Sequence, residues 1–316
     1  MSLRKSLEDA DEKYVGQTTG DWTQTQTTTS TEPLYFVKDL AYTEEEERAV
    51  VRILDTRLYP VVLLTTFVLN MDRTNISNAI SDNLASDLGF TLTTVNTATA
   101  IYSVFFSLFC FTGAVMAKIT GPARWIPILM FAWGWVTLSH ALITDRAGYL
   151  TVRVFIAITE GGVIPATLIY LGGFYKGTEL TTRLAGFWGV QSIASAVSGL
   201  MASGLLQLAG RGGLEGWKWL FVVDGIITVV GSVFFFLYLP RSITKTEGGI
   251  CGLKPWFTER QLQIAVTRLI RDDQSKEEYE KRATLQDFID AAKDVGLWGH
   301  LIITTAVLTP TNPLGT

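Results

Sequence analysis

Cysteine and histidine are almost absent from this sequence of 316 residues, which has two of each. Cys110 lies in an apolar run and Cys251 in a polar stretch, so the cysteines indicate neither a disulfide framework nor a cysteine-rich metal site. His140 and His300 lie in separate apolar segments, which leaves no zinc motif and no histidine-based catalytic triad. No glycine-rich loop ends in Lys-Ser or Lys-Thr to bind nucleotide phosphates. The sequence therefore predicts no metal, no cofactor and no enzyme.

Charge is also scarce. Charged residues make up 18% of the chain and hydrophobic residues 48%, whereas an average soluble protein has about 25% charged residues. The mean hydropathy is +0.27. The net charge of −4 and the dispersed cations argue against a nucleic-acid partner. The first 55 residues are polar and threonine-rich, without the apolar core of a secretory signal. We therefore expect a lipid bilayer as the environment, with insertion directed by an internal helix.

Long apolar segments account for the hydropathy. Each is close to the roughly 20 residues that a helix needs to cross the hydrocarbon core of a membrane. So few charges over such lengths are typical of membrane helices rather than of buried helices in a soluble protein. The sequence thus predicts an all-α polytopic membrane protein with a six-helix bundle. The six segments are Leu58–Thr74, Val95–Ala117, Trp125–Ile143, Tyr149–Tyr170, Leu184–Leu208 and Trp219–Leu239.

The regions around this bundle are polar. The tail has the composition of a disordered segment. Thr43 followed by Glu46 predicts a capping box at the start of a short amphipathic helix, and Thr258 is the expected N-cap of a second one. A seventh apolar run of about 14 residues is too short to span confidently. The expected organisation is a cytoplasmic disordered tail at 1–42, a cytoplasmic helix at 43–57, a six-helix domain at 58–240, a cytoplasmic linker at 241–294 and a truncated seventh helix at 295–316.

The cations in the short loops predict the orientation. Short cytoplasmic loops are enriched in Lys and Arg. With the N-terminus inside, the cytoplasmic flanks would hold Arg48, Arg52, Arg57, Lys118, Arg124, Lys176 and Arg183. The opposite side would hold Arg146, Arg211 and Lys218. We therefore expect a multi-pass protein, in the plasma membrane, with a cytoplasmic N-terminus.

Ionisable residues inside the apolar segments are the candidate functional residues, because such groups are costly in lipid. Asp72 and Arg73 lie in the first segment, and Arg153 and Glu160 in the fourth. At about 1.5 Å per residue, Asp72 lies about 20 Å from the start of its segment, and Arg153 about 6 Å from the start of the antiparallel one. In a core about 30 Å thick these depths are similar, so the two could pair. Glu160 lies about 10 Å deeper than Arg153, near the midplane.

Each of these residues also has a simpler interpretation. Asp72 and Arg73 could mark a frayed helix end in the headgroups, with Arg73 snorkelling. Arg153 could be an interfacial anchor, and Glu160 could be hydrogen-bonded to a neighbouring helix for structural reasons. Glu160 is too deep for a short side chain to reach the interface. Desolvation penalises its charged form, which would suit it to taking up and releasing protons.

Small residues line the fifth segment, and their spacing predicts close helix packing. Gln191, one turn before them, is either a helix–helix hydrogen-bonding group or a cavity-lining one. Gly161 and Gly162 after Glu160 predict a local bend in the fourth segment. The stripe consists of Ser195, Gly199 and Ser203, with Ala194, Ser198 and Ala202 beside it.

Several short motifs together resemble the fungal permeases of the major facilitator superfamily, in the allantoate permease-like group of anion:cation symporters. The resemblance covers about residues 43 to 308. Each motif is weak alone, but their order on a six-helix frame is specific. The motifs are DTRLYP at 55–60, LNMDRTNISNA at 69–79, DLGFT at 87–91, GPARWIP at 121–127, RVFIAITEGG at 153–162, GWKWLF at 216–221 and WFTER at 256–260.

The resemblance implies a fold of twelve helices in two halves, each half built from two inverted three-helix repeats. The second half would be truncated here. By analogy with the family, Arg73 would bind the carboxylate of the substrate, since a guanidinium stays charged and can donate two hydrogen bonds. Asp72 would pair with Arg153 and share in proton coupling. Glu160 would carry the coupled proton, and Gln191 would contact the substrate.

The function that follows is proton-coupled symport of a small organic anion, such as a carboxylate, ureide or vitamin. The expected partners are that anion, a proton and the bilayer. The alternative is a non-transporting half-permease: a pseudogene-like remnant, a gene-model fragment or a dominant-negative partner. Such a chain would act, if at all, with a second half-transporter or another copy of itself.

Overall fold

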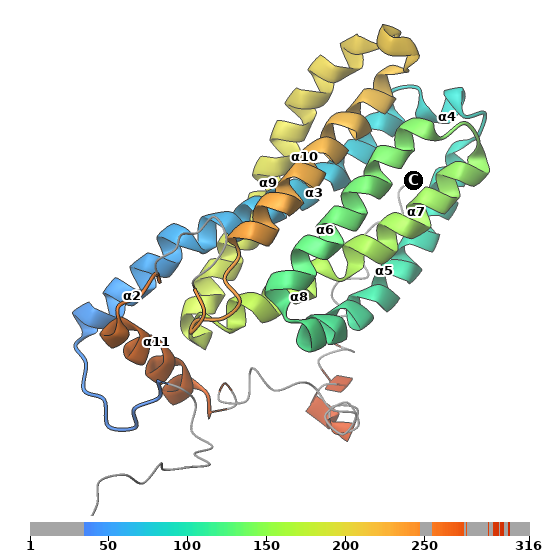
Figure 1. Ribbon diagram of the computed structural model, residues 1–316. Coiled ribbons are helices and arrows are strands. Elements are labelled where there is room, and N and C mark those ends of the chain that lie inside the picture. Colours follow the sequence, from blue (N-terminus) through green and yellow to red (C-terminus); the bar gives the residue numbers. More distant parts are fainter. Residues whose placement is uncertain are drawn as a thin grey trace, which may run out of the picture. The chain divides into compact units, whose positions relative to one another are not determined.

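The computed structural model describes residues 35–246 and 255–274, together with positions 276, 290, 293–296, 298, 299 and 303. Residues 1–34 of the expected disordered tail and most of the expected seventh helix therefore lie outside the described residues. The last part of the expected tail, residues 35–42, is described and is bound by α11, because Arg271 donates to the carbonyl oxygens of Lys38 and Leu40. In the described part, the regular elements are helices (Figure 1). The longer ones are α2 (Glu44–Arg57), α3 (Tyr59–Ser81), α5 (Leu92–Thr120), α6 (Pro122–Ser139), α7 (Arg146–Gly161), α8 (Val163–Gly172), α9 (Gly177–Leu205), α10 (Gly216–Tyr238) and α11 (Glu259–Asp272).

Six helical stretches of the described chain are long and apolar enough to cross a membrane. Each contains or largely overlaps one of the six apolar segments, so the prediction of an all-helical six-span bundle is confirmed. The first stretch joins α2 and α3 over Glu44–Ser81, and the fourth joins α7 and α8 over Arg146–Gly172. The helices pack in pairs, with α6 against α10, α3 against α9 and α5 against α7.

Helix α3 continues seven residues beyond Thr74, where the hydropathy had predicted its end. The polar residues of this extension are bound by neighbouring helices. Asn75 Nδ2 donates to Asp224 of α10 at 2.9 Å, and Asn78 Nδ2 donates to Ser198 of α9 at 3.2 Å. Asp72 and Arg73 therefore lie inside a continuous helix and not at a frayed end, because these contacts replace water for the polar side chains.

The fourth span is interrupted at Gly162, as the glycine pair predicted, and this position separates α7 from α8. The same glycines also allow α5 to approach closely. A Cβ atom on Gly113 of α5 would lie 2.3 Å from the Cα of Gly162, and one on Gly161 would lie 2.9 Å from the carbonyl oxygen of Phe106. Only residues without side chains fit at this crossing.

The packed face of α9 differs from the predicted stripe. Ala194, Ser198 and Ala202 are buried against the bundle, whereas Gly199 and Ser203 are exposed. A Cβ atom on Gly199 would meet no heavy atom within 4 Å. The expected stripe was therefore offset by one residue, which rotates the packed face by about 100° around the helix.

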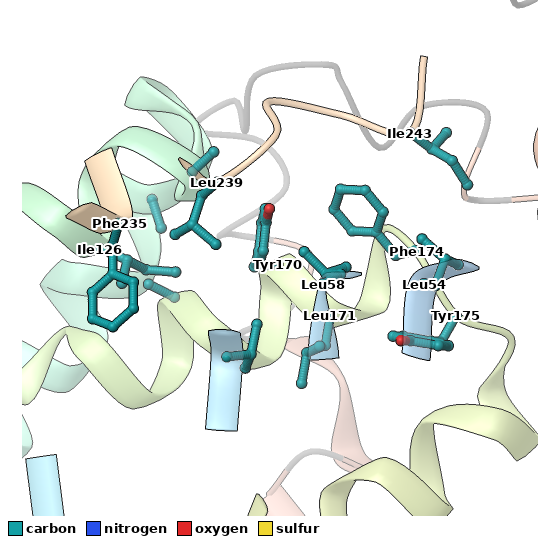
Figure 2. Packing of buried hydrophobic residues seen from close by; sticks show 14 of the residues in the cluster. Leu54, Leu58, Ile126, Tyr170, Leu171, Phe174, Tyr175, Phe235, Leu239 and Ile243 are labelled. Atoms are coloured by element: carbon teal, nitrogen blue, oxygen red, sulfur yellow. The ribbon is translucent and has the colours of Figure 1, made fainter. Parts of the chain in front are cut away.

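At the end of the bundle near α2, buried apolar side chains from distant parts of the chain form one cluster. Figure 2 shows Leu54 and Leu58 beside Leu171, Phe174 and Tyr175. These side chains join the start of the first span to the end of the fourth. The cluster fixes the relative positions of the helices that carry the candidate site.

Helix α11 packs against α2 at this end. Both predicted caps are confirmed, since Thr43 forms a capping box with Glu46 and Thr258 forms one with Gln261. The fully buried Arg268 of α11 donates from Nη1 to both carboxylate oxygens of Glu179, at 2.8 and 3.0 Å. Helix α11, which follows the six spans, is thus tied back to the first turn of α9.

Candidate functional site

An ion pair joins the first and fourth spans inside the bundle. Arg73 of α3 donates from Nε to Oε1 of Glu160, which lies on α7. The Glu160 side chain is 1% exposed and the Arg73 side chain 33% exposed. A carboxylate without water needs a cation or strong donors, so Arg73 and Glu160 stabilise each other's charge. The sequence placed both residues at a functional site but did not predict that they pair.

Two aromatic residues of α5 complete the surroundings of this pair. The Tyr102 hydroxyl donates to Oε2 of Glu160 at 2.8 Å, so both carboxylate oxygens are bound. The Arg73 guanidinium lies 5.0 Å from the ring centre of Phe106, and the Arg153 guanidinium lies 4.8 Å from that of Tyr102. These distances are typical of cation–π contacts.

Asp72 does not form the expected pair with Arg153. Among the described residues, no ion pair within 4.0 Å joins them. Asp72 instead accepts hydrogen bonds from Trp133 Nε1 at 2.8 Å and from Thr137 Oγ1 at 3.3 Å, both on α6. Successive helix residues point about 100° apart, so Asp72 faces α6 while Arg73 faces α5 and α7. Axial depth suggested the Asp72–Arg153 pair, and helix rotation prevents it in this structure.

Asp224 of α10 is a buried acid that was not among the residues expected at the site. It is 0% exposed and accepts a hydrogen bond from Asn75 at 2.9 Å. Asn75 in turn accepts one from Ser198 of α9 at 2.8 Å. A signal was present, because Asp224 is the single charged residue in the apolar run Trp219–Leu239. A charge in a membrane helix is as costly at Asp224 as at Glu160, so this position also indicates a functional residue.

Gln191 is exposed on α9 and does not contact the Arg73–Glu160 pair through any hydrogen bond between described residues. The nearest connection lies one helical turn away, where Ser195 and Thr74 approach at 3.2 Å between their hydroxyl oxygens. Gln191 therefore lies within about one helical turn of the depth of Arg73 along the bundle, but no hydrogen bond between described residues joins the two. For metals, the described residues contain no group of three or more His, Cys, Asp or Glu side chains able to hold an ion.

Residues 62–309 match the family model of the Major Facilitator Superfamily. The chain belongs to this superfamily. An uncharacterized transporter of Saccharomyces cerevisiae is 30% identical over 266 residues, which cover 83% of this chain and 49% of that protein. An uncharacterized transporter of Schizosaccharomyces pombe is 32% identical over 229 residues, covering 72% and 43% of the two chains. This major facilitator chain thus spans about half the length of these curated relatives.

A solved structure supports the same fold. A bacterial homologue of the human lysosomal transporter Spinster, in an inward-facing and unoccupied conformation, matches with a TM-score of 0.51 at 18% identity. The match covers 64% of this chain and 45% of that one. Major facilitator proteins are multi-pass membrane transporters and not enzymes.

Proposed function

We propose that this chain forms the substrate- and proton-binding half of a proton-coupled symporter for a small organic anion. Within the superfamily, the motifs around Asp72 and Glu160 favour the allantoate permease-like group. The observation that carries the proposal is the buried ion pair between Arg73 and Glu160. It brings the group best suited to bind a carboxylate into contact with the group best suited to bind a proton.

In this pair the carboxylate of Glu160 occupies the position that a substrate carboxylate would take on Arg73. A proton on Glu160 would neutralise it and release the guanidinium. The substrate anion would then restore a charge partner for Arg73, so proton and anion would bind together. Arg73 Nη2 has no hydrogen-bond partner among the described residues, which leaves a donor for a further acceptor. Binding of both would favour rocking between inward and outward states.

Other candidate residues have supporting roles. Tyr102 holds Glu160 through its hydroxyl and would keep the carboxyl next to Arg73 in either protonation state. Gln191 lies on an exposed part of α9 and would contact the substrate at its end away from the carboxylate. A cytoplasmic N-terminus would place α2 and α11 on the inner side of the plasma membrane.

The second candidate is a half-permease that does not transport by itself. The described residues hold six candidate spans, and transport in this superfamily uses the interface of two six-helix halves. Its activity would then depend on another half-transporter or a second copy. The two candidates differ in what the isolated chain does in a vesicle.

The test uses purified protein in liposomes, as the chain alone and fused to the second half of the Saccharomyces cerevisiae relative. Uptake of labelled ureide, vitamin and carboxylate anions is measured with and without an imposed pH gradient. We expect gradient-driven accumulation by the fusion, and its loss in Glu160→Gln while exchange of bound substrate survives. Accumulation that persists in Glu160→Gln would refute the proton assignment.

Arg73→Lys is the matched variant for the anion site, because it keeps the positive charge but loses the planar donor fork. We expect the KM for the anion to rise at least tenfold. Unchanged KM would remove Arg73 from the binding site. Accumulation of the anion by the chain alone would exclude the half-permease. If the fusion accumulates the anion and the chain alone does not, the half-permease is supported.

A further inference from the structure

Two neighbouring spans present an exposed apolar face. Helices α6 and α10 pack against each other and lie side by side in Figure 1. On each helix, large apolar side chains that are between 40% and 64% exposed recur every three or four residues, so they form a stripe along one side. The α6 stripe is Ile128, Phe131 and Trp135, and the α10 stripe is Ile226, Val230, Val233 and Leu237.

The two stripes lie on the same side of the helix pair. The helices touch at glycines, since a Cβ atom on Gly134 would lie 2.8 Å from a side-chain carbon of Val229, and one on Gly225 would lie 2.6 Å from a side-chain carbon of α6. Each glycine is followed directly by a stripe residue, Trp135 or Ile226, about 100° further around its helix. Because α6 and α10 run in opposite directions, equal rotation along each chain turns both stripes to the same side of the pair.

Both stripes end in exposed cations at the end of the bundle that carries α2. Arg124 lies one turn before Ile128 and is exposed on the same side of α6, and the exposed Arg241 follows the end of α10. Gly134 faces Val229 where the helices touch. Ten residues lead from Gly134 back to Arg124, and twelve lead from Val229 on to Arg241, so the two arginines lie at similar depth.

These cations lack a carboxylate partner in the described chain. Arg124, Arg241 and the exposed Lys245, in the turn after α10, form no ion pair within 4.0 Å with a described residue. The stretches around the stripes hold no Asp or Glu either, at 119–144 or at 225–246. The apolar face therefore ends in a local positive charge that the described residues leave unbalanced.

We propose that this face of α6 and α10 binds an anionic phospholipid. Its acyl chains lie along the two stripes, and its phosphate lies between Arg124, Arg241 and Lys245. A guanidinium can donate two parallel hydrogen bonds to a phosphate, and basic pockets between membrane helices bind acidic lipid head groups. With the cytoplasmic N-terminus proposed above, this end of the bundle lies in the leaflet that carries the anionic lipids.

The combination of stripes and cations favours a lipid over other occupants. A soluble anion would contact the cations but not the stripes, which lie in stretches long and apolar enough to cross a membrane. A second copy of the chain, packed through the same face, would bring its own Arg124 and Arg241 to the same depth, where like charges repel. An anionic phospholipid supplies apolar chains for the stripes and a negative group for the cations.

Native mass spectrometry of the purified chain in detergent tests the proposal with two lipids that have identical acyl chains. Palmitoyl-oleoyl phosphatidylserine is anionic, and the corresponding phosphatidylcholine has no net charge. We expect phosphatidylserine to bind at least about tenfold more tightly. Arg124→Gln and Arg241→Gln should each weaken phosphatidylserine binding about fivefold and leave phosphatidylcholine binding unchanged. Lys245→Gln, in a turn outside the helices, gives the same readout if one of these variants fails to fold.

Arg48→Gln is the matched control, because Arg48 is exposed at the same end of the bundle but is paired with Glu44 on α2. It should leave the affinities for both lipids unchanged. Glycerophosphoserine carries the head group without acyl chains and, in large excess, should not displace the bound lipid.

Three results would overturn the proposal. The first is equal binding of phosphatidylserine by the wild type and the variants at Arg124, Arg241 and Lys245. The second is displacement by glycerophosphoserine, which would make the cations a site for soluble anions. The third is a dimer that excludes the lipid, which would make the face an interface between copies. The measurement does not use transport, so failure of transport in the fusion would refute the proposed function and leave this result standing.

Discussion

The hydroxyl of Tyr102 donates a hydrogen bond of 2.8 Å to Oε2 of Glu160, while Arg73 binds Oε1 of the same carboxylate. One buried acid is thus held from two helices, α5 and α3. A hydrogen bond to a charged group contributes about 1.5–3 kcal/mol, roughly twice a neutral one. The Tyr102 hydroxyl therefore has a measurable share in the stability of the ionised site.

Replacing Tyr102 by Phe removes this hydroxyl and keeps the ring that contacts Arg153. We expect the free energy of unfolding to fall by about 1.5–3 kcal/mol. In a Glu160→Gln background the loss should be smaller, because the acceptor no longer carries a charge. A double-mutant cycle on thermal unfolding in detergent measures the coupling, which we expect at about 0.5–3 kcal/mol. Additive effects of the two substitutions would show that the hydroxyl and the carboxylate do not interact.

The crossing of α5 and the fourth span predicts a strong effect of one added methyl group. A Cβ atom on Gly113 would lie 2.3 Å from the backbone of Gly162, so Gly113→Ala forces the helices apart. We expect a loss of about 1–3 kcal/mol or more, measured as a lower unfolding midpoint and a lower yield of monodisperse protein. Gly199→Ala is the control, since no atom lies within 4 Å of its Cβ position. It should be neutral, or stabilising by up to about 1 kcal/mol. Equal effects of the two substitutions would contradict the close packing.

Features that depend on local sequence could be predicted from the sequence. The spans follow from apolar length, and the capping boxes at Thr43 and Thr258 follow from residues three positions apart. The bend at Gly162 follows from a glycine pair. The end of α3 could not be predicted in this way, because Asn75 is satisfied by Asp224, 149 residues further along the chain.

The partners within the site depend on helix rotation, which hydropathy does not specify. Rise per residue placed Asp72 and Arg153 at similar depth, but Asp72 is turned toward Trp133 and Thr137. Tyr102 gave no signal, since a tyrosine among apolar residues is ordinary in a membrane helix. On α9, small residues occupy two neighbouring positions in each turn, so the sequence alone did not specify which of the two faces the bundle.

The attachment of α11 predicts a contrast between a buried and an exposed arginine. Arg268 is fully buried and donates to Glu179 and to the carbonyl oxygen of Phe174. Arg268→Met would take one partner from Glu179, whose side chain is 19% exposed, and would leave the buried Phe174 carbonyl without this donor, at a cost of about 1–3 kcal/mol. We expect faster hydrogen exchange along α11 in intact protein. Arg260→Met is the comparison variant, because it removes an ion pair in which the Arg260 side chain is 47% exposed. It should lower the free energy of opening of α11, as measured by hydrogen exchange, by less than about 1 kcal/mol. Small effects of both substitutions would show that α11 is held by its apolar face alone.

Tyr175, in the loop between the fourth and fifth spans, predicts a loss of stability at alkaline pH. Burial, and then the nearby Asp55 carboxylate, raise the pKa of Tyr175 above its usual value. A raised pKa in the folded state contributes stability that is present below about pH 10, the unfolded value, and is lost as the pH rises above it. The loss can reach about 1.4 kcal/mol per pH unit.

Tyr175→Phe removes the ionisable hydroxyl and should flatten this alkaline decline. At neutral pH the variant should be less stable by about 1 kcal/mol, because the 3.0 Å hydrogen bond to Asp55 is lost. Unfolding midpoints followed between pH 9 and 11 in detergent provide the measurement. Asp55→Asn removes the nearby carboxylate, which is the second cause of the raised pKa of Tyr175, and leaves the burial of the ring, which is the first. The alkaline decline of this variant should lie between those of the wild type and Tyr175→Phe. An equally steep decline in Tyr175→Phe would assign the alkaline loss to other groups.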